Sequence, residues 1–178
     1  RYAHSGGLRF DTSNHSDIQV SSPIDGYLSR ASVYMVDTEV QYAFEIYHPC
    51  GRLITIDHIR SLTDKFEDIV EPITPVLDKA SMVDVEPTLV KAGELIATAA
   101  GLELADSTFV EIGYYNLTAI NSAANSRDFR QEHHNDALYS WHGLCWLESL
   151  PGESMRKLLE LPAADTDQGK VSDYCSEP

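Results

Sequence analysis

The sequence predicts a mainly β core followed by a helical or irregular C-terminal cap. Between residues 18 and 118, short apolar runs rich in Val, Ile, Tyr and Phe recur about every ten residues. Gly and Pro separate these runs, as they separate the strands of a β-sandwich or barrel. We therefore expect three parts, which are an irregular N-terminal segment (1–17), a β domain (18–118), and a cap with an acidic tail (119–178).

The first strands of the core are expected around a tight turn. The apolar run 18–20 is followed by Asp25-Gly26, a dipeptide typical of a hairpin turn, and by a second apolar run that ends at Leu28. Three further segments have strand composition: 32–35, 40–47 and 53–57. After the last of these, residues 58–66 are interpreted as one or two helical turns.

Prolines interrupt the second half of the core. Pro72, Pro75 and Pro87 argue against a long regular element over 71–87. Residues 89–97 have the pattern strand, turn, strand, with Gly93 in the turn, and 108–115 form the last predicted strand. In the cap, a stripe of apolar residues predicts a short helix over 154–161.

Size and composition are those of a folded protein. The chain has 178 residues, of which 43% are hydrophobic and 23% are charged. A chain of this length buries about two thirds of the surface of its unfolded form, so it needs no metal or disulfide merely to fold. No apolar run approaches the roughly 18 residues that a membrane-spanning helix needs, so membrane insertion is not expected.

The charge excludes two classes of partner. Asp and Glu number 28 against 13 Lys and Arg, which gives a net charge of -15. Proteins that bind nucleic acid carry the opposite sign, because neutralised phosphates supply most of the non-specific affinity. Anionic membrane surfaces repel such a chain for the same reason. We expect no nucleic-acid partner.

The three cysteines, Cys50, Cys145 and Cys175, are far apart and lack the close spacing of a zinc knuckle. Two arrangements are open. One is a disulfide between Cys145 and Cys175 that pins the tail, and the other is three reduced thiols in a cytosolic protein. The chain begins at Arg1 rather than Met, which is expected if a signal peptide or another leading segment has been removed.

Four segments of the core, residues 20–28, 47–59, 90–97 and 109–112, keep their order over about 95 residues. In these segments the chain resembles the lysostaphin-type zinc metallopeptidases, which cut peptidoglycan cross-bridges. Residues 20–28 are similar to the pattern V-x-A-P-x-D-G-x-V, and 47–59 resemble the stretch that ends in Tyr-x-His-Leu. Residues 90–97 are similar to V-x-x-G-Q-x-I-G, and 109–112 stand where the family has His-x-His-Phe-Glu-Val. The resemblance implies an antiparallel β core of barrel-sandwich hybrid type and does not cover 119–178.

The zinc ligands of that family do not carry over. The second His of His-x-His falls on Phe109 and the first falls on Ser107, and only His58 matches a catalytic position. A catalytic zinc needs three protein ligands and an open position for water. We therefore expect a degenerate member without a cofactor. Zinc remains possible at a rearranged site built from His15, Asp17 and His58.

These residues lead to three functional hypotheses. The first is a non-catalytic, exported binding or regulatory module that engages a cell-wall peptide or a protein partner, with Glu111 and Tyr114 as ligand-binding residues. The second is a zinc endopeptidase of peptidoglycan with displaced ligands. The third is a biotinyl-like carrier or assembly domain, which is disfavoured because the turn at 91–93 lacks the Met-Lys-Met of a swinging lysine.

Overall fold

The computed structural model describes residues 5–10, 14 and 18–161. It contains two compact units, which we treat separately. The first comprises residues 7–112, and the second comprises 113–178 together with 1–6. The division falls inside strand β9, close to the end of the predicted β domain at residue 118.

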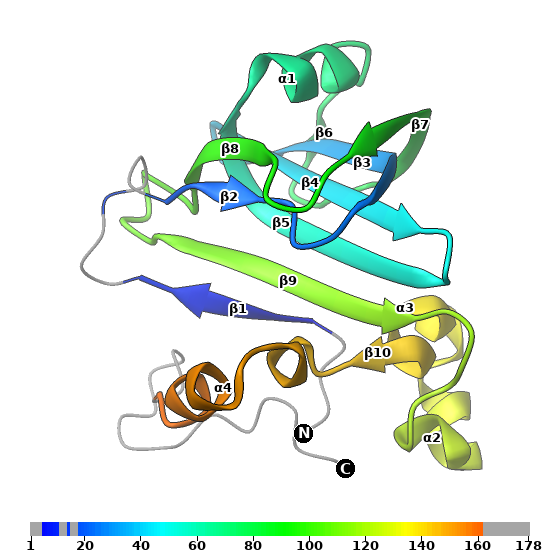
Figure 1. Cartoon of the computed structure of the whole chain (residues 1–178). Helices are drawn as coiled ribbons and strands as arrows, with labels where there is room; N and C mark the ends of the chain where they lie inside the picture. The colour runs from blue at the N-terminus through cyan, green and yellow to red at the C-terminus, as the bar shows by residue number, and fades with distance from the viewer. Residues whose placement is uncertain (1–4, 11–13, 15–17, 162–178) are drawn as a thin grey trace. The chain divides into compact units, whose positions relative to one another are not determined.

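The first unit consists mainly of strands with one helix (Figure 1). Two strands that reach into it, β1 and β9, cross the division between the units. The elements are β1 (Ser5–Arg9), β2 (Val20–Ser21), β3 (Gly26–Val36), β4 (Glu39–His48), β5 (Arg52–Leu62), α1 (Asp64–Val70), β6 (Val76–Leu77), β7 (Val83–Val90), β8 (Leu95–Ala100) and β9 (Phe109–Asn116).

The strands form an open, mixed sheet. Strands β9, β5, β4 and β3 are neighbours in that order; β3 also pairs with β6 and β7, and β8 pairs with β2 and β5. The short β3–β6 pair is parallel, whereas β3 pairs with β4 and β7 in antiparallel fashion. The prediction of a mainly β core is therefore confirmed.

Long strands of apolar residues supply the core of this unit. Leu28, Phe44, Ile46 and Ile59 in β3, β4 and β5 are completely buried. Apolar residues recur in these strands at the period of two that places alternate side chains on one face. Helix α1 adds Phe66, whose ring lies 5.8 Å from that of Phe44, measured between centroids.

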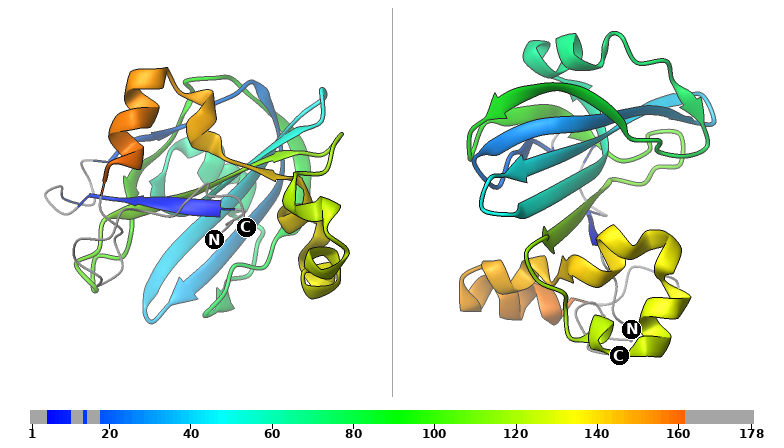
Figure 2. Two further views of the ribbon diagram at one scale, coloured as in Figure 1. Left: turned by 90° about the horizontal axis from the view of Figure 1, so that it is seen from below. Right: turned by 90° about the vertical axis from the view of Figure 1, so that its right-hand side faces the viewer.

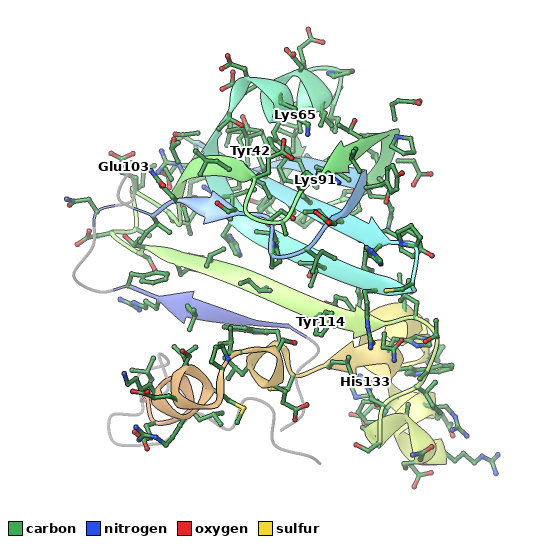
Figure 3. The ribbon with its side chains drawn as sticks, viewed as in Figure 1. Tyr42, Lys65, Lys91, Glu103, Tyr114 and His133 are labelled. Atoms are coloured by element: carbon green, nitrogen blue, oxygen red, sulfur yellow. The ribbon has the colours of Figure 1, made fainter. Side chains whose placement is uncertain are left out.

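Helix α1 is fastened to the strands by a lysine near its start. The ammonium of Lys65, which is labelled in Figure 3, donates to two groups. These are the carbonyl oxygen of Leu89 in β7 and the Glu94 carboxylate, each at 2.6 Å. This ion pair and the bond from the Lys91 backbone N–H hold the pKa of Glu94 below its usual value.

The expected hairpin at Asp25-Gly26 is wrong. Strand β2 pairs with β8, and not with β3, so no hairpin joins the two segments. Gly26 is required for a different reason. A Cβ on it would lie 2.7 Å from the Tyr47 carbonyl oxygen, so only glycine lets β3 and β4 approach here.

Two other local expectations are corrected. Residues 58–62 continue strand β5 and do not begin a helix, because Ile59 pairs with Tyr42 of β4, and Ile59, Arg60 and Leu62 pair with β8. Residues 5–9, expected to be irregular, form strand β1 beside β9. Gly7 permits this close pairing, since a Cβ there would lie 3.1 Å from the Val110 carbonyl oxygen.

The second unit contains the predicted helical cap. It includes the end of β9, helices α2 (Arg127–Glu132), α3 (Ala137–His142) and α4 (Gly152–Leu159), and the short strand β10 (Gly143–Leu144), which pairs with β9 (Figure 2). Buried Asn121 organises it, because its amide donates to the carbonyl oxygens of Ser140 and Gly143 and accepts from the Ala124 N–H. None of the helices in the described residues has the length and apolar character needed to cross a membrane.

Gly101 and Gly93 provide a matched test of backbone crowding in this fold. Both have φ angles above +80°, but a Cβ at Gly101 would lie 2.2 Å from the Ser107 carbonyl oxygen, whereas none of the heavy atoms lies within 4 Å at Gly93. We expect Gly93→Ala to lower the free energy of unfolding by about 1 kcal/mol, from the left-handed backbone alone. Gly101→Ala should lower it by about 2–4 kcal/mol, because overpacking adds to that cost.

Urea unfolding at constant pH measures both values, and Gly93→Ala is the control for the conformational cost. Equal losses in the two variants would contradict the close approach of the 101 and 107 backbones.

Candidate functional site

The candidate site is built on a bulge in the middle of strand β5. Tyr42 of β4 pairs with Ile59, and Phe44 pairs with Ile56, so two β5 residues, Asp57 and His58, lie opposite one β4 residue. The backbone of His58 has φ +60°, a left-handed conformation that is strained for a side chain other than glycine. Bulges re-aim side chains and occur near binding sites.

Backbone hydrogen bonds hold the strained residue in place. The N–H of Gly101 donates to the His58 carbonyl oxygen at 2.8 Å. The carbonyl oxygen of Gly101 in turn accepts from the side-chain amide of buried Gln41 at 3.1 Å. The surrounding structure therefore over-determines the conformation of His58, as strained functional residues require.

Three side chains form a hydrogen-bonded chain at the bulge. The Tyr34 hydroxyl donates to Asp57 Oδ1 at 2.6 Å, and the same oxygen accepts the backbone N–H of His58 at 2.6 Å. Nδ1 of His58 lies 3.1 Å from the Tyr34 hydroxyl oxygen. Since the single hydroxyl proton goes to the Asp57 carboxylate, Nδ1–H of His58 donates to Tyr34, and this pattern assigns the lone pair of the neutral imidazole to Nε2.

Burial sets the protonation of this chain. Burial raises the pKa of the Asp57 carboxyl, and the negative charge of Glu111 raises it further. His58 and the hydrogen bond from Tyr34 lower this pKa, but the net shift is upward. Burial also raises the pKa of the Tyr34 hydroxyl far above its usual range, with further contributions from Asp57 and Glu111. Tyr34 therefore remains a protonated donor at every physiological pH.

Strand β9 supplies an aromatic ring and a carboxylate next to the imidazole. The ring of Phe109 lies 4.4 Å from that of His58, centroid to centroid, at an interplanar angle of 49°. Glu111 follows two residues later, so its side chain lies on the same face of the strand as Phe109. Its effect on the pKa values of Tyr34 and Asp57 places its charge within electrostatic reach of them.

The structure brings together only part of the predicted set. His58 and Glu111 belong to one cluster in the first unit, whereas Tyr114 belongs to the second unit. The sequence analysis missed Tyr34 and Asp57. The available signal was an acidic residue at the end of the apolar strand segment 53–57, directly before His58. Tyr34 had no signal, because a tyrosine in a strand is usually part of the packing.

The described side chains do not fit a catalytic zinc. Phe109 has no lone pair to offer, and both Nδ1 of His58 and Oδ1 of Asp57 are engaged in hydrogen bonds. Within the described ranges, no three His, Cys, Asp or Glu side chains converge on a metal-sized site. His15 and Asp17, the other ligands of the rearranged site, lie outside the described residues, so that site stays a prediction.

Among the cysteines, Cys50 belongs to the first unit. Cys50 is a free, exposed thiol at the β4–β5 turn, and its Sγ lies 2.8 Å from Nδ1 of His48. Cys175 lies outside the described residues, so its pairing with Cys145 also stays a prediction.

Comparison of the chain with protein-family models, with curated proteins and with solved structures finds no match. The resemblance to the lysostaphin-type peptidases therefore rests on the sequence patterns alone.

The raised pKa of Asp57 predicts a specific pH dependence of stability. The folded state holds the Asp57 proton more tightly than the unfolded chain, so this carboxyl lowers stability as the pH rises from about 4, its ordinary pKa, through its raised pKa. Asp57→Asn removes the buried charge. We therefore expect the free energy of unfolding of Asp57→Asn, minus that of the unmodified protein, to increase between pH 3.5 and pH 7.

Urea unfolding of both proteins at several pH values measures this difference. Glu132→Gln, which removes an exposed carboxylate on α2, is the control for the loss of a surface charge. A flat difference for Asp57→Asn would show that its carboxyl titrates normally.

Proposed function

We propose that this chain is a non-catalytic, exported module that binds a cell-wall peptide at the cluster around His58. The observation that carries the proposal is the hydrogen-bonded chain from Asp57 through Tyr34 to His58, which fixes one imidazole tautomer on a strained bulge. Strain of this kind costs roughly 1–3 kcal/mol and concentrates at functional sites. A ring held at such a cost is suited to presenting Nε2 to a ligand.

The chemistry of the cluster favours a ligand that donates hydrogen bonds. Nε2 of His58 has no hydrogen bond to a described residue, and in the neutral ring it accepts. Phe109, which is half-buried, offers an apolar face beside it, and Glu111 adds negative charge. A peptide with backbone N–H groups and a free amino group supplies the donors, and its aliphatic part covers the ring.

The aromatic ring at 109 also supports the non-catalytic part of the proposal. Hydrolysis of an amide by a zinc enzyme uses the metal to polarise the carbonyl group and to activate water. The described donors do not fit that ion. The alternative is a zinc endopeptidase with His15, Asp17 and His58 as ligands. One observation favours it, namely that Nε2 of His58 has no hydrogen bond to a described residue.

The proposal predicts the effect of substitutions in the cluster. Asparagine tolerates a positive φ better than most residues, so His58→Asn removes the imidazole with little change of backbone. We expect His58→Asn to weaken the binding of soluble cell-wall peptide fragments at least tenfold, which is about 1.4 kcal/mol. Glu111→Gln should weaken it roughly threefold, more at low salt than at high salt. Isothermal titration calorimetry measures both.

A control variant, a further test variant and a cleavage assay accompany the titrations. His134→Asn alters an exposed histidine of the second unit and should bind normally. Tyr34→Phe keeps the ring but leaves Nδ1 of His58 without its partner, so it should lose affinity and change the pH dependence of binding. The fragments are also assayed for new amino groups with and without added zinc.

We expect tight binding by the unmodified protein and release of no amino groups. Cleavage on addition of zinc would overturn the non-catalytic proposal in favour of the endopeptidase. Normal binding by His58→Asn would move the ligand away from this cluster. Binding to a protein partner but not to the fragments would overturn the cell-wall peptide as the ligand.

A further inference from the structure

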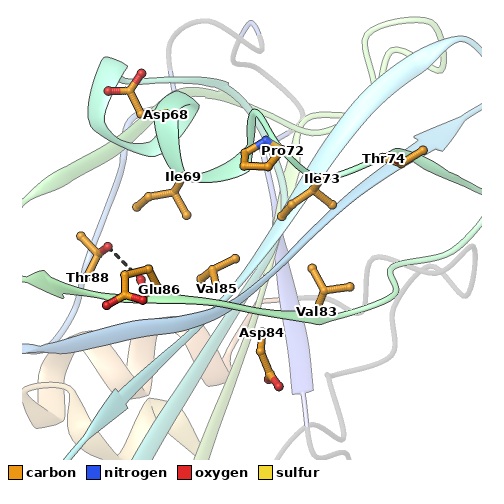
Figure 4. A pocket seen from close by; sticks show the side chains of 10 residues that line it. All are labelled: Asp68, Ile69, Pro72, Ile73, Thr74, Val83, Asp84, Val85, Glu86 and Thr88. Carbon is orange, nitrogen blue, oxygen red and sulfur yellow. Dashed lines mark hydrogen bonds between the residues drawn. The ribbon is translucent and has the colours of Figure 1, made fainter.

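A hollow in the first unit shares no residue with the His58 cluster. It lies between strand β7 on one side and helix α1 with the segment that follows it on the other (Figure 4). Its volume is about 700 Å³, which is in the range of sites that hold ligands.

The two walls of the groove are aliphatic. Ile69 and Ile73 point from the helix side toward β7, and Val83 and Val85 point from β7 toward the helix (Figure 4). Val83 is 41% exposed, and Ile69, Ile73 and Val85 are half-buried. Apolar side chains that face each other across an open hollow favour an apolar occupant, because burial removes their surface from water.

The rim of the groove is acidic. Asp68 on α1 and Glu86 on β7 belong to the lining, with the Asp68 carboxylate directed away from β7 (Figure 4), and none of the ten lining residues is a lysine or arginine. Neither carboxylate forms an ion pair with a described residue. Asp84 is different, since its side chain points away from the groove and lies 3.4 Å from the Arg30 guanidinium. Two uncompensated carboxylates beside an aliphatic hollow complement a ligand that is both cationic and aliphatic.

The shape of the groove favours an extended ligand. Among the described strands, β7 pairs only with β3, so its other edge has no strand partner. Helix α1 lies on the side of β7 to which Val83 and Val85 point, and Lys65 of the helix donates to the Leu89 carbonyl oxygen (Figure 4). The register of β7 against β3 is irregular between Asp84 and Thr88, and Pro87 lies in this interval. Unpaired strand edges bind extended peptides, with pockets for alternate side chains.

We propose that this groove binds an extended segment of a partner protein in which aliphatic side chains alternate with lysine or arginine. The alternation follows from the period of two of an extended chain, which directs successive side chains to opposite sides. One set fills the space between Ile73 and Val85, and the other points outward, toward the carboxylates of Asp68 and Glu86 at the mouth of the groove. This is a second binding surface, independent of the cell-wall peptide proposed for His58.

Three fluorescently labelled nonapeptides test the proposal by fluorescence anisotropy with the full chain. One alternates lysine and valine, the second replaces each lysine by glutamate, and the third replaces each valine by serine. We expect the lysine–valine peptide to bind at least tenfold more tightly than either of the others. Its affinity should fall between 0.05 and 0.5 M salt, because exposed charges are screened.

Variants locate the site. The double variant Asp68→Asn, Glu86→Gln changes exposed side chains and should weaken the lysine–valine peptide at least fivefold. Glu132→Gln, which removes an exposed charge outside the groove, should bind normally, and so should His58→Asn. Ile73→Ser should weaken binding also at high salt, and its thermal unfolding is recorded to show that it folds.

The outcomes separate the possibilities. Equal binding of the lysine–serine peptide would mean a purely electrostatic attraction and would overturn the groove. Equal binding of the glutamate–valine peptide would overturn the role of the carboxylates. Full affinity in the double variant, or failure of all three peptides to bind, would overturn the proposal. Loss in His58→Asn would assign the peptide to the His58 cluster instead.

Discussion

The backbone conformation of His58 is the constraint on which the first unit depends. Strand β5 pairs with β4 along most of its length, and after the bulge it also pairs with β8, through Ile59, Arg60 and Leu62. The extra residue in β5 bends the strand between these partners. Without it, the residues after the bulge would shift by one position and turn buried Ile59 to the opposite face. Gly101, at the end of β8, completes the arrangement by donating its N–H to the His58 carbonyl oxygen.

The same backbone conformation explains why the hydrogen-bonded side chains of Tyr34, Asp57 and His58 lie at the bulge. The bulge places the His58 N–H within 2.6 Å of the Asp57 carboxylate, which also accepts from Tyr34. Hydrogen bonds to a charged group contribute roughly 1.5–3 kcal/mol each. They oppose the cost of burying the carboxylate, whose pKa nevertheless stays raised, and they oppose the strain at His58, which is roughly 1–3 kcal/mol. The bulge and the candidate site therefore depend on the same hydrogen bonds, because Tyr34 and Asp57 stabilise the backbone conformation that presents the His58 imidazole.

The sequence predicts the strands of this unit much better than their partners. Composition and the period of two locate β3, β4, β5, β8 and β9, because burial of one face dictates those patterns. The bulge is not predictable in this way. It depends on Ala43 facing two residues of β5, and this register is fixed only when β4, β5 and β8 pair together. Asp25-Gly26 misled for the same reason, since its glycine serves contact between strands and not a turn.

The site shows the same limit. His58 and Glu111 could be selected because each is a polar residue in an apolar context. Tyr34 could not, because its role arises from the pairing of β3 with β4 and of β4 with β5, which carries it to Asp57 from 23 positions away. The aliphatic groove was missed because its walls come from separate segments around prolines. In such segments, neither the period of a strand nor that of a helix persists long enough to show a face.

The strong negative charge of the chain contributes to ligand binding at both of these surfaces. A net charge of -15 attracts cationic partners over a distance set by the salt concentration and repels phosphate and anionic lipid. That attraction alone does not select a ligand. Selection needs apolar surface beside the carboxylates, and the structure provides it twice, with Phe109 near Glu111 and with the aliphatic walls between Asp68 and Glu86. Both places favour a ligand that combines donors of hydrogen bonds with apolar parts, and peptides meet this requirement better than sugars or simple cations.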